Sequence, residues 1–81
     1  MDNIRALQAV TRECNTARKR YPKFNSAHEE YAVLLEEVDE LWDEVKKSPK
    51  KRDPAAMRTE AIQVAAMALR FLIDLCENSP E

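Results

Sequence analysis

The sequence contains no glycine, and proline occurs only four times in its 81 residues. Without glycine the chain cannot form the Gly-rich loop that cradles phosphates in many nucleotide-binding proteins. The composition is instead heavy in Ala, Leu, Glu, Lys, Arg and Met, which favour helix over strand. The lack of chain-breaking residues therefore predicts an all-α fold.

Histidine and cysteine are also scarce, with one His and two Cys in the chain. So small and dispersed a set argues against a zinc site, which needs a cluster of nitrogen and sulfur ligands. Cys14 and Cys76 fall within apolar faces of the expected helices, where a free Cys behaves as a small hydrophobic residue. We interpret both as reduced thiols of a cytoplasmic protein.

Long hydrophobic runs and a strong net charge are both absent. No segment approaches the roughly 18 uninterrupted apolar residues that a membrane span needs, and the N-terminus lacks the basic start and apolar core of a signal peptide. The 13 basic and 15 acidic residues give a formal charge of -2, too weak to attract nucleic acid by electrostatics alone. We therefore expect a soluble protein whose partners include neither a membrane nor a nucleic acid.

Apolar residues at helical spacing predict three helices within one domain. Their approximate bounds within the domain 1–81 are residues 2–18, 26–47 and 53–77. Ser26 and Glu29 have the spacing of a capping box, and Asp53 precedes Pro54 as an N-cap precedes the first helical position. The apolar face of helix 2–18 is Ile4, Leu7, Val10, Cys14 and Ala17, and that of helix 26–47 is Tyr31, Leu34, Leu35, Val38, Leu41, Trp42 and Val45.

Helix 53–77 has apolar residues on two adjacent faces. One face consists of Ala61, Ile62, Ala65, Ala68, Leu69, Leu72 and Cys76, and the other of Met57, Val64, Met67 and Phe71. A helix that is apolar over so much of its circumference is buried on more than one side. A chain this short also has a thin margin of stability, which a partner subunit would increase. We therefore expect three helices per chain packing as part of a four-helix-bundle-type homo-oligomer, a dimer or a tetramer.

The segment 36–44 contains six acidic residues and no basic one. Helical rotation places Glu37 at the edge of the apolar stripe and Glu40 one turn away on the same side, while Glu60 lies on an apolar face of the next helix. If packing brings these carboxylates within about 5 Å, each ionised pair repels by roughly 3 kcal/mol at an effective dielectric constant of about 20. A divalent cation relieves this repulsion, and an all-oxygen carboxylate site suits Mg²⁺ or Mn²⁺.

These acidic residues resemble the motifs of a known family. Glu36-Glu37-Val38-Asp39-Glu40-Leu41 is similar to the EExxE(L) signature of the MazG-like all-α nucleotide pyrophosphohydrolases, and Glu60-Ala61-Ile62-Gln63 stands where that family carries ExxD. The resemblance covers about residues 26–75. It implies a Mg²⁺-dependent enzyme that converts a nucleoside or deoxynucleoside triphosphate to a monophosphate and pyrophosphate, as in house-cleaning of the nucleotide pool. It also implies a dimer or tetramer built around four-helix bundles.

Carried over residue by residue, the resemblance implies metal ligands at Glu37, Glu40, Glu60 and Gln63. Catalysis is then assigned to Glu36 and Glu37, with Glu36 orienting the attacking water. Gln63 departs from the family's Asp, and its amide oxygen can coordinate a cation but contributes no charge. This departure predicts that the site binds fewer metal ions or binds them more weakly.

A basic loop lies between the second and third expected helices. Its residues Lys47, Lys50 and Lys51 are candidates for gripping the leaving pyrophosphate, and a solvated loop that only adds solubility is the alternative. The acidic residues also have a second interpretation, because acidic faces of helices are often simply solvated. The competing hypothesis is therefore a non-catalytic helical dimer, a protein-interaction module with a MazG-like fold.

Overall fold

The computed structural model describes residues 1–21 and 23–77. They form α1 (Asn3–Arg20), α2 (Ala27–Val45), α3 (Pro54–Phe71) and η1 (Leu72–Glu77), a short π-helix that continues α3. The regular elements of the described chain are thus all helical, which confirms the predicted class. Within the same residues, no helix combines the length and the apolar character needed to cross a lipid bilayer.

Each of the three α-helices begins at a side-chain cap. Asp2, Ser26 and Asp53 accept hydrogen bonds from backbone N–H groups in the first turns of α1, α2 and α3, at 2.9, 3.1 and 2.9 Å. Such caps are each worth about 1 kcal/mol. In a capping box the Glu side chain also accepts a hydrogen bond from the backbone N–H of the cap residue. Here the Glu29 carboxylate accepts a hydrogen bond from Asn25 Nδ2, at 3.3 Å.

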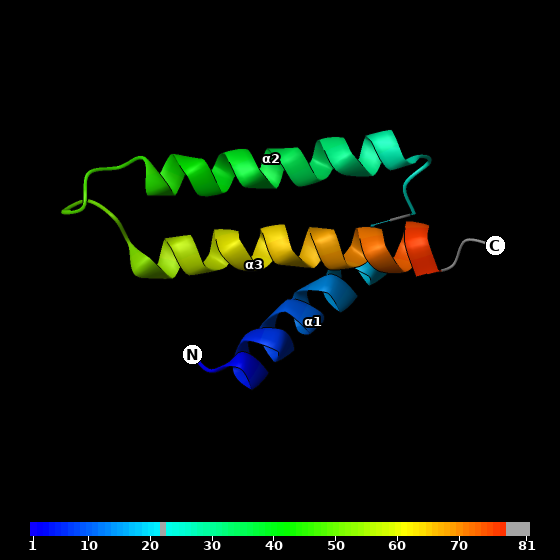
Figure 1. The fold of residues 1–81 in the computed structure, drawn as a ribbon, viewed down its shortest axis with the longest axis horizontal. Helices are drawn as coiled ribbons and strands as arrows, with labels where there is room; N and C mark the ends of the chain where they lie inside the picture. Colours follow the sequence, from blue (N-terminus) through cyan, green and yellow to red (C-terminus); the bar gives the residue numbers. More distant parts are fainter. Residues whose placement is uncertain (22, 78–81) are drawn as a thin grey trace.

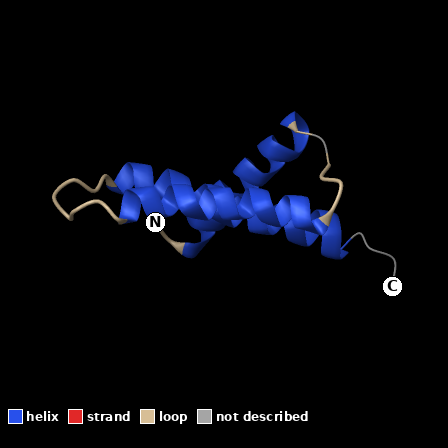
Figure 2. Ribbon diagram, turned by 90° about the horizontal axis from the view of Figure 1, so that it is seen from above, coloured by secondary structure: helices blue, strands red, loops and turns tan. Residues whose placement is uncertain are grey.

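The helix α3 lies between the other two. α2 and α3 run antiparallel side by side, joined by the loop 46–53, and α1 packs against α3 on another side (Figure 1). Seen from above, α1 crosses the α2–α3 pair at an angle rather than running along it (Figure 2). The second apolar face of α3 is therefore at least half-buried within a single chain, so burying it does not require a second subunit; its residues are Met57, Val64, Met67 and Phe71.

The fully buried apolar core is small, and among the described residues it consists of Cys14, Ala66 and Met67. The predicted apolar face of α1 is wrong at its N-terminal end, because Ile4 and Leu7 are 69 % and 66 % exposed. The crossing angle is the reason, since the first turns of α1 diverge from α3 (Figure 1). The inward side of α1 is formed instead by Ala6, Ala9, Val10, Glu13, Cys14 and Ala17.

A buried polar cluster ties α1 and the connector 21–26 to the C-terminal end of α3. The Arg70 guanidinium, 2 % exposed, lies 3.3 Å from Asp74 Oδ2, donates to the backbone carbonyl of Tyr21 at 3.3 Å and stacks 4.4 Å from the centre of the Phe24 ring. Arg18 Nε lies 3.3 Å from the other oxygen of Asp74. The two guanidinium groups therefore compensate the charge of Asp74, which makes the desolvation of this carboxylate tolerable.

Candidate metal centre

Three glutamates from two helices converge beside the α2–α3 contact. Glu37 and Glu40 are one turn apart on α2, and Glu60 approaches from α3; one carboxylate oxygen of each lies within 4.8 Å of the others. Glu37 and Glu60 are half-buried, while Glu40 is exposed. The structure thus brings together the three carboxylates that the sequence predicts as ligands, in a group, the acidic trio, that is open to solvent on one side.

The acidic trio is electrostatically strained. Glu37 Oε2 and Glu60 Oε2 are buried and have no hydrogen-bond partner among the described residues. Burial, reinforced by the charge of Glu40 and then of Glu60, raises the pKa of Glu37 to about 7. Burial and the charge of Glu40 also raise the pKa of Glu60. A proton or a cation that compensates the negative charge of the carboxylates therefore stabilises this arrangement at neutral pH.

The donor set fits a hard divalent cation. It offers carboxylate oxygens only, two of them buried and without a partner, and Mg²⁺ and Mn²⁺ prefer such ligands. The exposed side of Glu40 leaves room for water molecules and phosphate oxygens, which Mg²⁺ commonly keeps in its remaining positions.

Gln63 follows Glu60 by one turn of α3, and its amide nitrogen donates to Glu13 Oε1 of α1 at 2.9 Å. Both residues are half-buried and line the same cavity as the acidic trio. Glu36 is exposed and lies outside the cavity wall, although its charge contributes to the raised pKa of Glu37.

The basic loop occupies a different place. Lys47 lies 3.0 Å from Glu44 Oε1, and Lys50 and Lys51 are exposed. In the described part of the chain, none of these three lysines lines the cavity beside the acidic trio. The structure thus places the predicted metal ligands, but not the predicted phosphate-binding lysines, around one cavity.

That cavity has a volume of about 790 Å³ and is bounded by α1, the connector, α2 and α3. Its size is within the range of sites for drug-sized molecules and cofactors. The cationic residues on its wall are Arg20, Lys23 and Arg70, and apolar surface comes from Phe24, Val33 and Met67. Carboxylates, cations and apolar surface thus lie around a single space.

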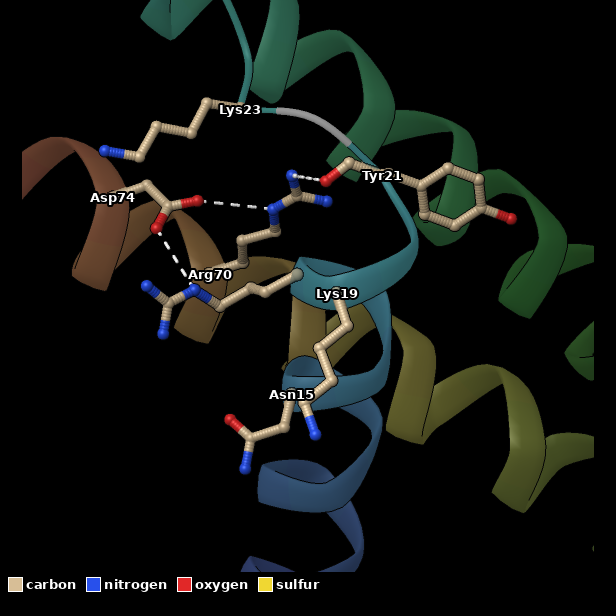
Figure 3. Close-up of a pocket in the computed structure, with 7 residues that line it drawn as sticks. Asn15, Lys19, Tyr21, Lys23, Arg70 and Asp74 are labelled. Carbon is tan, nitrogen blue, oxygen red and sulfur yellow. Dashed lines mark hydrogen bonds and ion pairs between the residues drawn. The ribbon is translucent and has the colours of Figure 1, made fainter.

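A smaller cavity of about 320 Å³ adjoins it and shares Tyr21, Lys23 and Arg70 with it. Figure 3 shows Lys23 on the connector and Lys19 on α1, with the Arg70 guanidinium between them directed at Asp74 and at the Tyr21 carbonyl. Arg70 therefore serves mainly to hold the connector, since its guanidinium is already engaged by Asp74 and by the Tyr21 carbonyl.

Sequence reasoning missed Glu13, Arg20 and Lys23 as cavity residues. For Glu13 a pattern was available, because it lies on the same helical face as Val10 and Ala17 and is therefore directed inward. Arg20 follows Ala17 by one turn on the same face, but it lies beyond the predicted helix end at residue 18. Lys23 offers no such pattern, since it stands in the connector, where no periodicity applies.

Comparison of the chain with protein-family models, with curated proteins and with solved structures gives no significant match. The fold and the site by themselves define a three-helix all-α domain that carries a partly exposed acidic cluster.

Proposed function

We propose that this chain is a Mg²⁺-dependent nucleoside triphosphate pyrophosphohydrolase of the MazG-like type, cleaving the bond between the α and β phosphates. The observation that carries the proposal is the convergence of Glu37, Glu40 and Glu60 within 4.8 Å, from the two helices that bear the family-like motifs. The 790 Å³ cavity beside them gives room for a nucleotide.

In this proposal the three carboxylates hold Mg²⁺, with Mn²⁺ as a substitute, and Gln63 adds an amide oxygen. The bound cation supplies charge neutralisation of the triphosphate and a lowered pKa for the attacking water. Glu36 and Glu37 orient that water and accept its proton. The exposed position of Glu36 supports this role less directly than the position of Glu37 does.

The cations of the cavity wall are the better placed partners for the polyphosphate chain. Arg20 and Lys23 line the cavity and have no ion pair within the described chain, so their charges are available to phosphate oxygens. Lys47, by contrast, is engaged with Glu44. We therefore assign substrate binding first to Arg20 and Lys23 and keep Lys47, Lys50 and Lys51 as the competing set.

The first test is stabilisation by the metal. At about ten times the dissociation constant, a cation that binds only the native state adds roughly 1.4 kcal/mol, which raises the Tm of a domain this size by about 6–10 °C. We expect this rise with Mg²⁺ and Mn²⁺, and pyrophosphate release when nucleoside triphosphates are then added. We expect Glu37→Gln to abolish both.

Asp39→Asn is the matched control, because it makes the same acid-to-amide change at an exposed position of α2 outside the acidic trio. It should leave the metal-induced rise intact. The metal-free Tm of Glu37→Gln should equal or exceed that of the wild type, since one source of repulsion is removed. A wild-type protein whose Tm is unchanged in millimolar Mg²⁺ and Mn²⁺ contradicts the proposal.

A second candidate function has its own support. Tyr31, Leu35, Val38 and Trp42 form a stripe along α2 that is 41–58 % exposed, and such surfaces mark protein interfaces. We propose that a second copy of the chain covers this stripe, giving a dimer or tetramer. If the metal test fails while the oligomer is present, the non-catalytic helical interaction module becomes the better description.

A further inference from the structure

The hydrogen bond between Gln63 and Glu13 connects two residues fifty positions apart, on α3 and α1. Gln63 Nε2 donates to Glu13 Oε1 at 2.9 Å, and both side chains are half-buried. An ionised carboxylate accepts hydrogen bonds and donates none, so only the nitrogen end of the amide can face Glu13. The orientation of the Gln63 amide is thus determined by its partner, and this hydrogen bond leaves its carbonyl oxygen free for another partner.

The direction of that oxygen matters because of what else lines the cavity. Gln63 lies one turn after Glu60 on α3, and both share the cavity wall with Glu37 and Glu40. A glutamine that can rotate presents either its oxygen or its N–H₂ group to a nearby cation, and the N–H₂ group repels it. An amide anchored through its nitrogen presents only the oxygen.

We propose that Glu13 is a positioning residue that directs the carbonyl oxygen of Gln63 to the cation held by the acidic trio. The inference rests on the metal-binding part of the proposed function and deepens it. Ligands held by such outer partners typically lose 10- to 100-fold in metal affinity when the partner is removed.

Glu13 acts through Gln63 rather than on the cation directly. Among the His, Cys, Asp and Glu side chains of the described residues, the group whose ligand atoms all lie within 4.8 Å of one another is Glu37, Glu40 and Glu60, and Glu13 is not in it. Its carboxylate instead lies 2.9 Å from the nitrogen of Gln63. This arrangement predicts a dependence on Glu13 that exists only while residue 63 is an amide.

The test uses Glu13→Met, Glu13→Gln and the same changes combined with Gln63→Glu. Mg²⁺ and Mn²⁺ affinities are measured by calorimetry, and the metal-free Tm is recorded in parallel. We expect Glu13→Met, whose thioether sulfur is only a weak acceptor, to weaken binding about tenfold or more. Glu13→Gln retains an acceptor oxygen and should recover part of that loss.

The combination with Gln63→Glu is the decisive comparison. A carboxylate at position 63 presents an oxygen in either orientation and is repelled by Glu13, so here the loss of Glu13 should leave binding unchanged or strengthen it. Equal weakening in both backgrounds, or wild-type affinity in Glu13→Met, overturns the positioning role but leaves the metal site intact. Absence of any binding by the wild type overturns the metal site and the inference with it.

Discussion

The inward face of α2 carries three glutamates whose surroundings differ. Glu44 pairs with Lys47 at 3.0 Å, and Glu37 belongs to the acidic trio. Glu30 is fully buried, and neither of its oxygens has a hydrogen-bond partner in the part of the chain that the structure describes. Three glutamates on one helical face thus have different roles because their neighbouring atoms differ: Glu44 is an ion-pair partner, Glu37 a candidate metal ligand and Glu30 a desolvated acid.

Glu30 makes stability depend on pH. Burial raises its pKa above the ordinary value of 4.5, the charge of Asp74 adds to the rise, and the charge of Arg70 opposes it. The folded state therefore holds this proton more tightly than the unfolded state. The stabilisation is complete below about pH 4.5 and is lost as the pH rises through the raised pKa.

We therefore expect Glu30→Gln to raise the Tm by several degrees at pH 8, because the amide avoids ionisation in a buried site. The difference from wild type should shrink as the pH falls below about 4.5, where both side chains are neutral. Thermal unfolding followed by circular dichroism across this range measures it. Glu29→Gln, at the exposed neighbouring position, is the control and should show no gain at pH 8.

At the scale of elements, the apolar stripe of α2, which the sequence predicts as continuous, is divided into a half-buried part and an exposed part. Leu34, Leu41 and Val45 are half-buried against α3. The other residues of that stripe are exposed, because a helix contacts one straight neighbour along a narrow strip only; they are Tyr31, Leu35, Val38 and Trp42. Glu37 lies within the inward strip, which is why its carboxylate reaches Glu60.

The two segments that flank α2 both carry lysines, and they differ in whether those lysines line the large cavity. The connector 21–26 carries Lys23 on the wall of the large cavity, whereas the loop 46–53 carries Lys50 and Lys51 away from it. A hydrogen bond to a charged group contributes about 1.5–3 kcal/mol, equivalent to a change of tenfold or more in affinity. We expect Lys23→Ala to raise the KM for a nucleoside triphosphate by about tenfold.

The matched control is the double variant Lys50→Ala/Lys51→Ala, whose KM should stay within about twofold of the wild type, since exposed charges far from a ligand are largely screened. Steady-state pyrophosphate release measures both variants. A larger rise in KM for Lys50→Ala/Lys51→Ala than for Lys23→Ala would assign substrate binding to the basic loop between α2 and α3 instead.

The whole molecule is extended and thinly packed. Its accessible surface is 6194 Å², whereas a folded monomer of 9.4 kDa has about 5,000 Å². Its radius of gyration is 13.9 Å, against about 12 Å for a compact chain of this length. The excess of roughly 1,200 Å² is larger than the roughly 800 Å² per partner that a standard interface buries, so the chain has surface enough for the proposed oligomer.

The exposed stripe of α2 gives this proposal a direct test. We expect Val38→Lys to reduce the molar mass in light scattering from a multiple of 9.4 kDa to 9.4 kDa, because a lysine at the centre of the stripe would have to be desolvated. Leu7→Lys, at a 66 % exposed position of α1, should leave the oligomer intact. A wild-type protein of 9.4 kDa at micromolar concentration contradicts the oligomer.

Local chemistry allowed much of this protein to be predicted from its sequence. The caps at Ser26 and Asp53 and the apolar spacing locate the helices, because both act within a few residues of the chain. The short loop 46–53 makes α2 and α3 antiparallel neighbours, and helical rotation then directs Glu37 and Glu40 toward Glu60. The acidic trio was therefore predictable without a structure.

The path of α1 was decided only by tertiary packing. Its crossing angle over α3 depends on how side chains of both helices interlock, which no local pattern specifies. That angle exposes Ile4 and Leu7, places Glu13 against Gln63, and brings the end of α1 to the cavity. The sequence by itself determined the helices and the acidic trio; the packing of α1 determined which further residues surround it.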